Sequence, residues 1–415
     1  MRTFLLGALP CLLTAQAPPL TYEDILKGAR TSPEQYRTEA LLAERHRALN
    51  GTRGFLREGP SLGIAAGPRT HPTLPTTTDQ SVELDLPLFL SPGARRRLEE
   101  SLGQADPALR GAARIEAQFH LRRAYLDAWL TERLLQLREA DLATVQSWLK
   151  AARVRLEAGA DPGFQVSLVE GEVLRAQADL DETRRQRLNA WAALRALADV
   201  PGTPMPLADP GEALPPQAEG LAVKFETSAL HRAIQSRLDL EQRALLHQEA
   251  IATSRWSLRG SYAKEGDERI GKAGLAYRFS RPGEGQALRR GVEATLQATR
   301  RELEVALLEL DARFQSALTR LQTATPPLPF KGFDLSLKAI SLRLSEGKER
   351  PSEALPIRRQ LLEAQVASYR RLQAAHLLTA ELQALTEAGV GTKAHQAKLD
   401  PLGGAQDVRR DEVNP

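Results

Sequence analysis

The chain has 415 residues, of which 26% are charged and 42% hydrophobic, and its formal net charge is +4. No apolar run reaches the ~18 residues that a membrane-spanning helix requires, and a single cysteine cannot form a disulfide within its own chain. The small basic excess is dispersed and does not favour nucleic acid as a partner. Ala, Leu, Arg, Glu and Gln dominate long stretches, which indicates long helices or coiled coils.

The first 17 residues are predicted to be a secretory signal peptide. An apolar stretch from Phe4 to Thr14 follows a basic start, and Ala15 and Ala17 supply the small residues of a cleavage site. Cys11 lies inside this leader and follows Pro10 rather than a small residue, which argues against a lipid anchor. We therefore expect an exported chain without cysteine.

An internal repeat organises the rest of the chain. VELDLPLFLSPG, which begins at Val82, aligns with AGLAYRFSRPG, which begins at Ala273. The number of residues that separates matching positions changes steadily along the chain, as loops of unequal length require. The predicted parts are a first repeat (18–200), a linker rich in Pro and Gly (201–221), a second repeat (222–389) and a polar, disordered tail (390–415).

Each repeat is predicted to contain a helix, two strands and a long helical hairpin. In the first repeat the strands are expected at 60–67 and 81–89, and an outgoing helix at 94–158 with a break near Pro107. The glycines and proline of 159–163 predict the tip, where the return helix begins. Apolar residues of both helices recur at spacings of three and four, which predicts that they pack as an antiparallel coiled-coil pair.

The second repeat is expected to follow the same order, with strands at 256–264 and 271–279 and a hairpin tip near 347–351. The segment TPPLPFKG (325–332) is expected to interrupt its outgoing helix, and Pro356 lies within its return helix.

The strand candidates alternate between apolar and polar residues, so one face of each is apolar. This pattern fits either a soluble sheet covered by helices or an outer-membrane barrel. The second repeat favours the barrel, because its apolar faces carry the aromatic residues that line a membrane interface: Trp256, Tyr262, Tyr277 and Phe279. A barrel needs at least ~8 strands, and an open sheet edge cannot lie in lipid. If these four strands enter the membrane, several chains must share one barrel.

The duplicated order of helix, strand pair and hairpin resembles the TolC family of outer-membrane efflux proteins. The resemblance rests on RLEAGADPGFQVSLVEGEVLRAQADL (Arg155 to Leu180), RLSEGKERPSEALPIRRQLLEAQVASY (Arg343 to Tyr369) and LDLPLFLSPGARRR (Leu84 to Arg97). It implies a mostly α protein with a small β part, in which each chain of a homotrimer gives four strands to a 12-stranded barrel in outer-membrane lipid. It also implies an α-helical barrel in the periplasm, which meets a periplasmic adaptor protein and an inner-membrane transporter.

The resemblance further implies roles for residues at the hairpin tips. Arg155 and Gly159 of the first repeat, with Arg343 and Gly347 of the second, are expected to form the adaptor-docking tips. The family closes its periplasmic entrance with acidic residues six and nine positions after the second tip glycine. Here these positions hold Glu353, the expected gate residue, and Pro356, so one acid is missing. The equivalent position of the first repeat is Gln165.

No catalytic or metal-binding pattern is present. The seven histidines are scattered without metal-ligand spacing, and neither a nucleophile elbow nor a phosphate-binding loop occurs. The basic runs at 95–97, 184–185 and 289–290 are interpreted as solvated helix faces. We therefore expect a passive exit duct without enzymatic activity or cofactor. The alternative is a periplasmic coiled-coil structural or adaptor protein that never enters the membrane.

Overall fold

The computed structural model describes residues 18–52, 61–69, 77–211, 219–265, 268–279, 283–323, 333–346 and 348–388. The expected leader, the expected tail and Gly347 lie outside these residues. In chain order the elements are α1 (Tyr22–Lys27), α2 (Pro33–Gly51), β1 (Ser61–Arg69), β2 (Thr77–Pro87), α3 (Pro92–Glu157), α4 (Gly163–Leu197), α5 (Leu221–Glu226), α6 (Ala229–Thr253), β3 (Trp256–Glu265), β4 (Glu268–Tyr277), α7 (Glu284–Thr323), α8 (Phe333–Ser345) and α9 (Pro351–Thr386).

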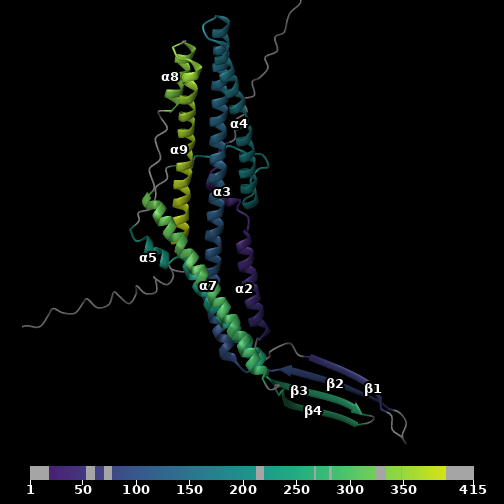
Figure 1. Cartoon of the computed structure of the whole chain (residues 1–415). Helices are drawn as coiled ribbons and strands as arrows, with labels where there is room; N and C mark the ends of the chain where they lie inside the picture. The colour runs from purple at the N-terminus through teal and green to yellow at the C-terminus, as the bar shows by residue number, and fades with distance from the viewer. Residues whose placement is uncertain are drawn as a thin grey trace, which may run out of the picture. The chain divides into compact units, whose positions relative to one another are not determined.

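The described chain is mostly helical with one four-stranded antiparallel sheet, which confirms the expected fold class (Figure 1). Its residues form two compact units. Unit 1 comprises the described residues within 1–30, 120–215 and 324–380, and unit 2 comprises those within 31–119, 216–323 and 381–415. Each unit takes segments from both sequence repeats, so the repeats are intertwined and do not fold as separate bodies.

Helix α3 is continuous through Pro107, so the expected break is wrong. A proline in a helix costs about 3 kcal/mol, because its ring nitrogen cannot donate to the carbonyl four residues earlier. Pro107 and Gly103, which carries that carbonyl, are both exposed, so water can hydrate the free group. On the opposite side of the helix, Leu102, Ala105 and Leu109 are buried in the core of unit 2 and hold the helix together. Helix α9 likewise runs through the exposed Pro356.

The expected interruption of the second outgoing helix falls between α7 and α8. Helix α7 ends at Thr323 and α8 begins at Phe333, and the residues between them lie outside the described part of the chain.

Part of the predicted linker packs into the core of unit 1. Leu207 is buried in a cluster with Trp129 and Trp191. The Trp191 indole donates to the carbonyl of Pro201 at 2.9 Å, and the Tyr125 hydroxyl donates to the carbonyl of Ala208 at 2.6 Å. Residues 201–211 of this segment are therefore held against the core of unit 1 rather than forming a free linker.

Candidate membrane sheet and hairpin tips

The sheet of unit 2 has the strand order β1-β2-β3-β4, each strand antiparallel to the next. Residues directly opposite one another in such a pair share a face. One row joins Ile64, Val82 and Tyr262, and the next joins Leu62 and Leu84 to Gly260. A further row joins Leu86, Leu258 and Leu275.

These rows place the apolar residues of all four strands on one face. Leu62, Ile64 and Leu275 are 63%, 76% and 66% exposed, so no other described element covers this face. The opposite face is polar, and Arg259 forms an ion pair with Asp85 across β2 and β3 at 3.3 Å. A contiguous exposed apolar surface of this kind indicates contact with lipid or with another protein.

Three of the four predicted aromatic residues share the apolar face. Trp256 and Tyr277 are direct partners at the helix-proximal end of the sheet, with ring centroids 5.0 Å apart, and Tyr262 lies farther along β3. The fourth, Phe279, lies two residues beyond the end of β4, although its ring contacts that of Tyr277 at 5.0 Å.

The predicted strand ends at Phe89 and Phe279 are therefore wrong. Strand β2 ends at Pro87, and the N–H of Leu88 makes one further bond, to the carbonyl of Trp256 at 2.8 Å. Phe89 instead lies buried against the ring of His247, with centroids 5.5 Å apart. His247 is fully buried and bonded to the Thr52 hydroxyl at 3.1 Å, and this burial lowers its pKa.

Both outer edges of the sheet are open. Within the described residues, no strand pairs with the free side of β1 or of β4. Their backbone N–H and C=O groups therefore need water or a second chain as partner.

In unit 1, the α3–α4 tip forms around Arg155 and Gly159. Gly159 has φ of +70°, a left-handed conformation that glycine adopts without strain, and its N–H donates to the carbonyl of Leu156. The Arg155 guanidinium lies 2.8 and 3.0 Å from the two carboxylate oxygens of Asp161. It also donates to the carbonyl of Glu349 at 3.2 Å, so Arg155 joins its own turn to the segment after α8.

The second repeat reproduces this arrangement more loosely. Arg343, which is exposed, lies 3.4 Å from the Glu349 carboxylate six residues on, as Arg155 lies beside Asp161 six residues on. The spacing of arginine and acid is visible in both repeats of the sequence, but the sequence reasoning missed it.

Glu353 and Gln165, which occupy equivalent repeat positions, have different surroundings. Glu353 is exposed in the first turn of α9. Gln165 is 2% exposed, and its amide bonds both the hydroxyl and the backbone N–H of Ser352, at 3.2 and 3.1 Å. Gln165 therefore caps the start of α9 from the other hairpin.

The sequence reasoning also missed a buried ion network beneath the tips. Arg358 of α9 donates to both carboxylate oxygens of Asp141 in α3, at 2.9 and 3.1 Å, and to Glu172 in α4 at 3.2 Å. Arg359 pairs with the same Glu172. Burial raises the pKa of Asp141, and the nearby guanidinium of Arg358 opposes that rise. The network joins α9 to both helices of the first hairpin.

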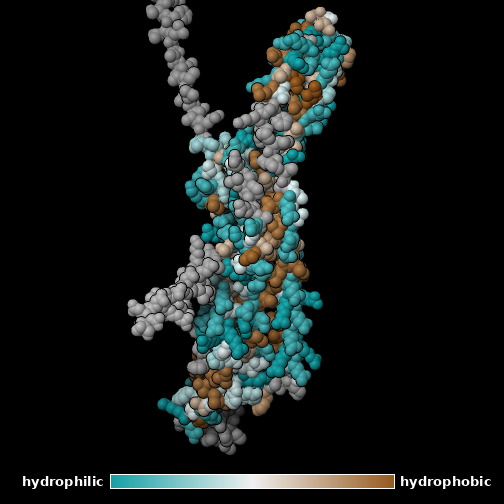
Figure 2. Space-filling model, turned by 90° about the vertical axis from the view of Figure 1, so that its left-hand side faces the viewer, coloured by the Kyte–Doolittle hydropathy of each residue, from teal (hydrophilic) through white to brown (hydrophobic). Residues whose placement is uncertain are grey.

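Apolar residues are also exposed at the tip of the first hairpin. Val154 and Phe164 are 63% and 58% exposed, on α3 and α4 respectively. Figure 2 shows apolar residues among hydrophilic ones at the upper end of the molecule, where the tips lie.

Among the described residues, no helix is both long and apolar enough to cross a membrane.

Comparison with known proteins gives a family match for part of the chain and a fold for nearly all of it. Residues 65–199 match the family described as outer membrane efflux proteins. No curated protein is significantly similar in sequence. A membrane protein from Pseudomonas aeruginosa has 19% identity and a TM-score of 0.59, over 94% of this chain and 97% of that one.

Two further structures of similar fold are outer membrane channels. The CmeC outer membrane channel of Campylobacter jejuni has 11% identity and a TM-score of 0.67, over 91% of this chain and 88% of that one. The MtrE outer membrane channel of Neisseria gonorrhoeae, in its open state, has 18% identity and a TM-score of 0.65, over 88% of each chain. At these identities the likeness establishes the fold.

The predicted location is the outer membrane with a helical extension in the periplasm, and the family agrees with it. The resemblance to the TolC family is thereby confirmed: residues 65–199 match the family of outer membrane efflux proteins, and the chain shares the fold of solved outer membrane channels along about nine-tenths of its length.

Proposed function

We propose that this outer-membrane efflux channel is the passive exit duct of a tripartite pump, assembled as a homotrimer with a shared 12-stranded barrel. The observation that carries the proposal is the sheet, with its exposed apolar face and two open edges. Lipid would cover the apolar face. An open edge in lipid would leave backbone groups without partners, so β4 of one copy must pair with β1 of the next.

The number of strands favours three copies. Two copies would supply eight strands, and an eight-stranded barrel is filled by its own side chains. Three copies supply twelve and leave room for a lumen, lined by the polar face that carries Asp85 and Arg259. Such a duct conducts what other proteins deliver and needs no catalytic residue.

The hairpin tips are the proposed contact with a periplasmic adaptor, which would connect the duct to an inner-membrane transporter. Gly159 supports this role, because its exposed turn has no side chain to hinder a partner and its added Cβ would meet no atom within 4 Å. Arg155 and Arg343 fix the two turns, and the proposal includes Gly347 by its equivalence to Gly159.

Glu353 is the proposed gate residue. In a trimer it would form a ring of three carboxylates, which would attract cations. Its exposure in α9 leaves it free for this role, although an acid in the first turn also stabilises the helix through the backbone dipole.

The alternative, a periplasmic coiled-coil protein that stays outside the membrane, accounts poorly for the apolar sheet face. The test is conductance of the purified chain in planar lipid bilayers. We expect stable pores from the wild type and none from Val82→Arg/Leu84→Arg, on the middle rows of the apolar face, because arginine at the bilayer midplane costs about 2–4 kcal/mol per site. Ser257→Arg, on the polar face of β3, is the matched control and should still conduct. A chain that extracts without detergent and forms no pores would contradict the proposal.

A further inference from the structure

Helices α3 and α7 of unit 2 begin beside the sheet (Figure 1), and a set of arginines lies near these starts in the sequence. Arg278 follows β4 directly, and two groups lie within the first two turns of the helices that follow β2 and β4. These residues, called the arginine collar below, are Arg95, Arg96 and Arg97 of α3, Arg278, and Arg289 and Arg290 of α7.

The collar has more positive charge than its neighbours neutralise. Arg96 pairs with Glu100 at 2.9 Å, and Arg289 pairs with Glu249 at 3.3 Å. The other four, Arg95, Arg97, Arg278 and Arg290, have no ion-pair partner within the part of the chain that the structure describes. The collar therefore has uncompensated charge available to an external anion.

The position of the α3 arginines is unfavourable for the helix itself. A helix N-terminus carries partial positive charge, which favours acidic residues and disfavours basic ones. The first turn of α3 contains no acidic residue, and three consecutive arginines follow within two turns. Arg96 gains a local partner in Glu100, but Arg95 and Arg97 have no ion-pair partner among the described residues, and a local rule broken without a local gain marks a place where function outweighs stability.

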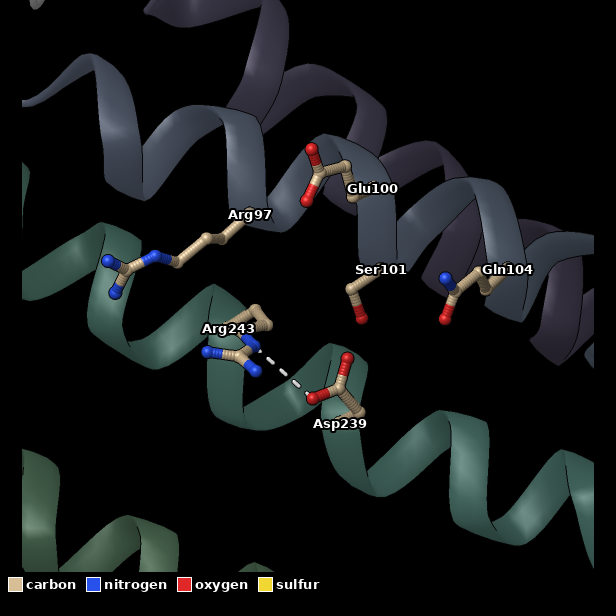
Figure 3. Close-up of a pocket in the computed structure, with 6 residues that line it drawn as sticks. All are labelled: Arg97, Glu100, Ser101, Gln104, Asp239 and Arg243. Carbon is tan, nitrogen blue, oxygen red and sulfur yellow. Dashed lines mark hydrogen bonds and ion pairs between the residues drawn. The ribbon is translucent and has the colours of Figure 1, made fainter.

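Figure 3 shows a polar pocket beside Arg97, between α3 and α6, with a volume of about 280 Å³. Asp239 pairs with Arg243 at 3.2 Å, and Glu100 pairs with Arg96, so these charges cancel. The charge left over is that of Arg97. The hydroxyl of Ser101, a residue only 5% exposed, lines the pocket and has no hydrogen-bond partner.

The collar's distance from the membrane follows from the proposed function, on which this inference rests. The paired rings of Trp256 and Tyr277 mark the interface of the bilayer, where such aromatics gather. Arg278 comes one residue later. Helical side chains lean toward the helix N-terminus, and α3 and α7 both begin at the sheet, so their arginines lean toward the lipid. The headgroup layer is about 5–7 Å thick, and long arginine side chains extend into it.

We propose that the arginine collar binds anionic phospholipid headgroups of the leaflet nearest the helices, and that the pocket of Arg97 and Ser101 receives one headgroup phosphate. A guanidinium matches the geometry of phosphate with two parallel hydrogen bonds. The free Ser101 hydroxyl adds a donor at the base of the pocket.

The test is native mass spectrometry of the full-length particle in detergent doped with equal amounts of phosphatidylglycerol and phosphatidylcholine. The wild type should retain phosphatidylglycerol in preference. Arg97→Gln/Arg290→Gln should weaken that preference by about fivefold per arginine, the equivalent of about 1 kcal/mol each. Arg97→Lys/Arg290→Lys, which keeps the charge, should retain most of it.

Arg300→Gln/Arg301→Gln is the matched control, because these exposed arginines lie three turns farther along α7. This variant should behave as the wild type. Inorganic phosphate at the lipid's concentration should not displace phosphatidylglycerol. An inserted trimer that retains both lipids equally, or that loses phosphatidylglycerol to free phosphate, would overturn the collar proposal alone. A water-soluble monomer would overturn the proposed function as well.

Discussion

Removing Arg358 should be among the most destabilising single changes in the helical part of the chain. Its side chain is 4% exposed, and those of Asp141 and Glu172 are 5% and 6% exposed. Arg358→Met keeps the apolar stem but leaves two buried carboxylates with less compensation. Breaking a buried pair in this way costs about 3–5 kcal/mol. At about 2–4 °C per kcal/mol, the apparent melting temperature should fall by on the order of 10 °C.

The assay is thermal unfolding in detergent, followed by circular dichroism at one scan rate. Arg185→Met is the matched control, because Arg185 is 72% exposed and its pair with Glu182 should contribute less than about 1 kcal/mol. Adding Asp141→Asn to Arg358→Met should recover part of the lost melting temperature, since it removes one buried carboxylate that has lost its partner. If Arg358→Met melts within a degree or two of the Arg185→Met control, the network does not hold the hairpins together.

Four further predictions concern pH, the tip and the gate. Burial lowers the pKa of His247 and of His376, so the stability that each contributes is fully present above the unfolded pKa of about 6.5 and is lost as pH falls toward the folded pKa. In His247→Gln the urea midpoint should therefore depend less on pH between 7.5 and 5.5 than in the wild type. An unchanged pH dependence of the midpoint would contradict this. Gly159→Ala should destabilise by roughly 1 kcal/mol because of its positive φ, whereas Gly171→Ala inside α4 should stabilise, and equal effects would remove the argument. A bulky residue at Gly159 or Gly347 should abolish efflux at unchanged trimer yield; a parallel loss of yield would make the glycines structural only. Glu353→Gln should reduce cation selectivity and divalent block in bilayer recordings under a salt gradient, and an unchanged reversal potential would leave Glu353 as a helix-start residue.

The sheet could be predicted from the sequence because the pattern that indicates a strand lies within the strand itself. Alternation along SVELDLPL and the second-repeat strands assigns each side chain to a face, and the register places Leu84 and Leu258 on the same face. The strand ends were less predictable. Leu88 continues the alternation and its N–H still donates to the carbonyl of Trp256, whereas Phe89 leaves the sheet and its ring packs on His247.

Features that depend on distant contacts left little signal in the sequence. In the sequence Leu207 looks like part of a linker, and only the structure shows that it packs in the buried cluster that contains Trp129 and Trp191. Arg358 and Asp141 are separated by 217 residues, and the first-repeat position equivalent to Arg358 holds Glu170, so the repeat does not reveal the network. By contrast, the acids six residues after Arg155 and Arg343 were visible in both repeats and could have been found.

The central claim is that the four strands of one chain are a third of a shared membrane barrel. The most direct test is the mass of the full-length particle, purified in detergent and measured by native mass spectrometry, in which the detergent is removed inside the instrument. The account predicts a particle of three chains that is stable only with detergent or lipid. A stable monomer in buffer without detergent would contradict it.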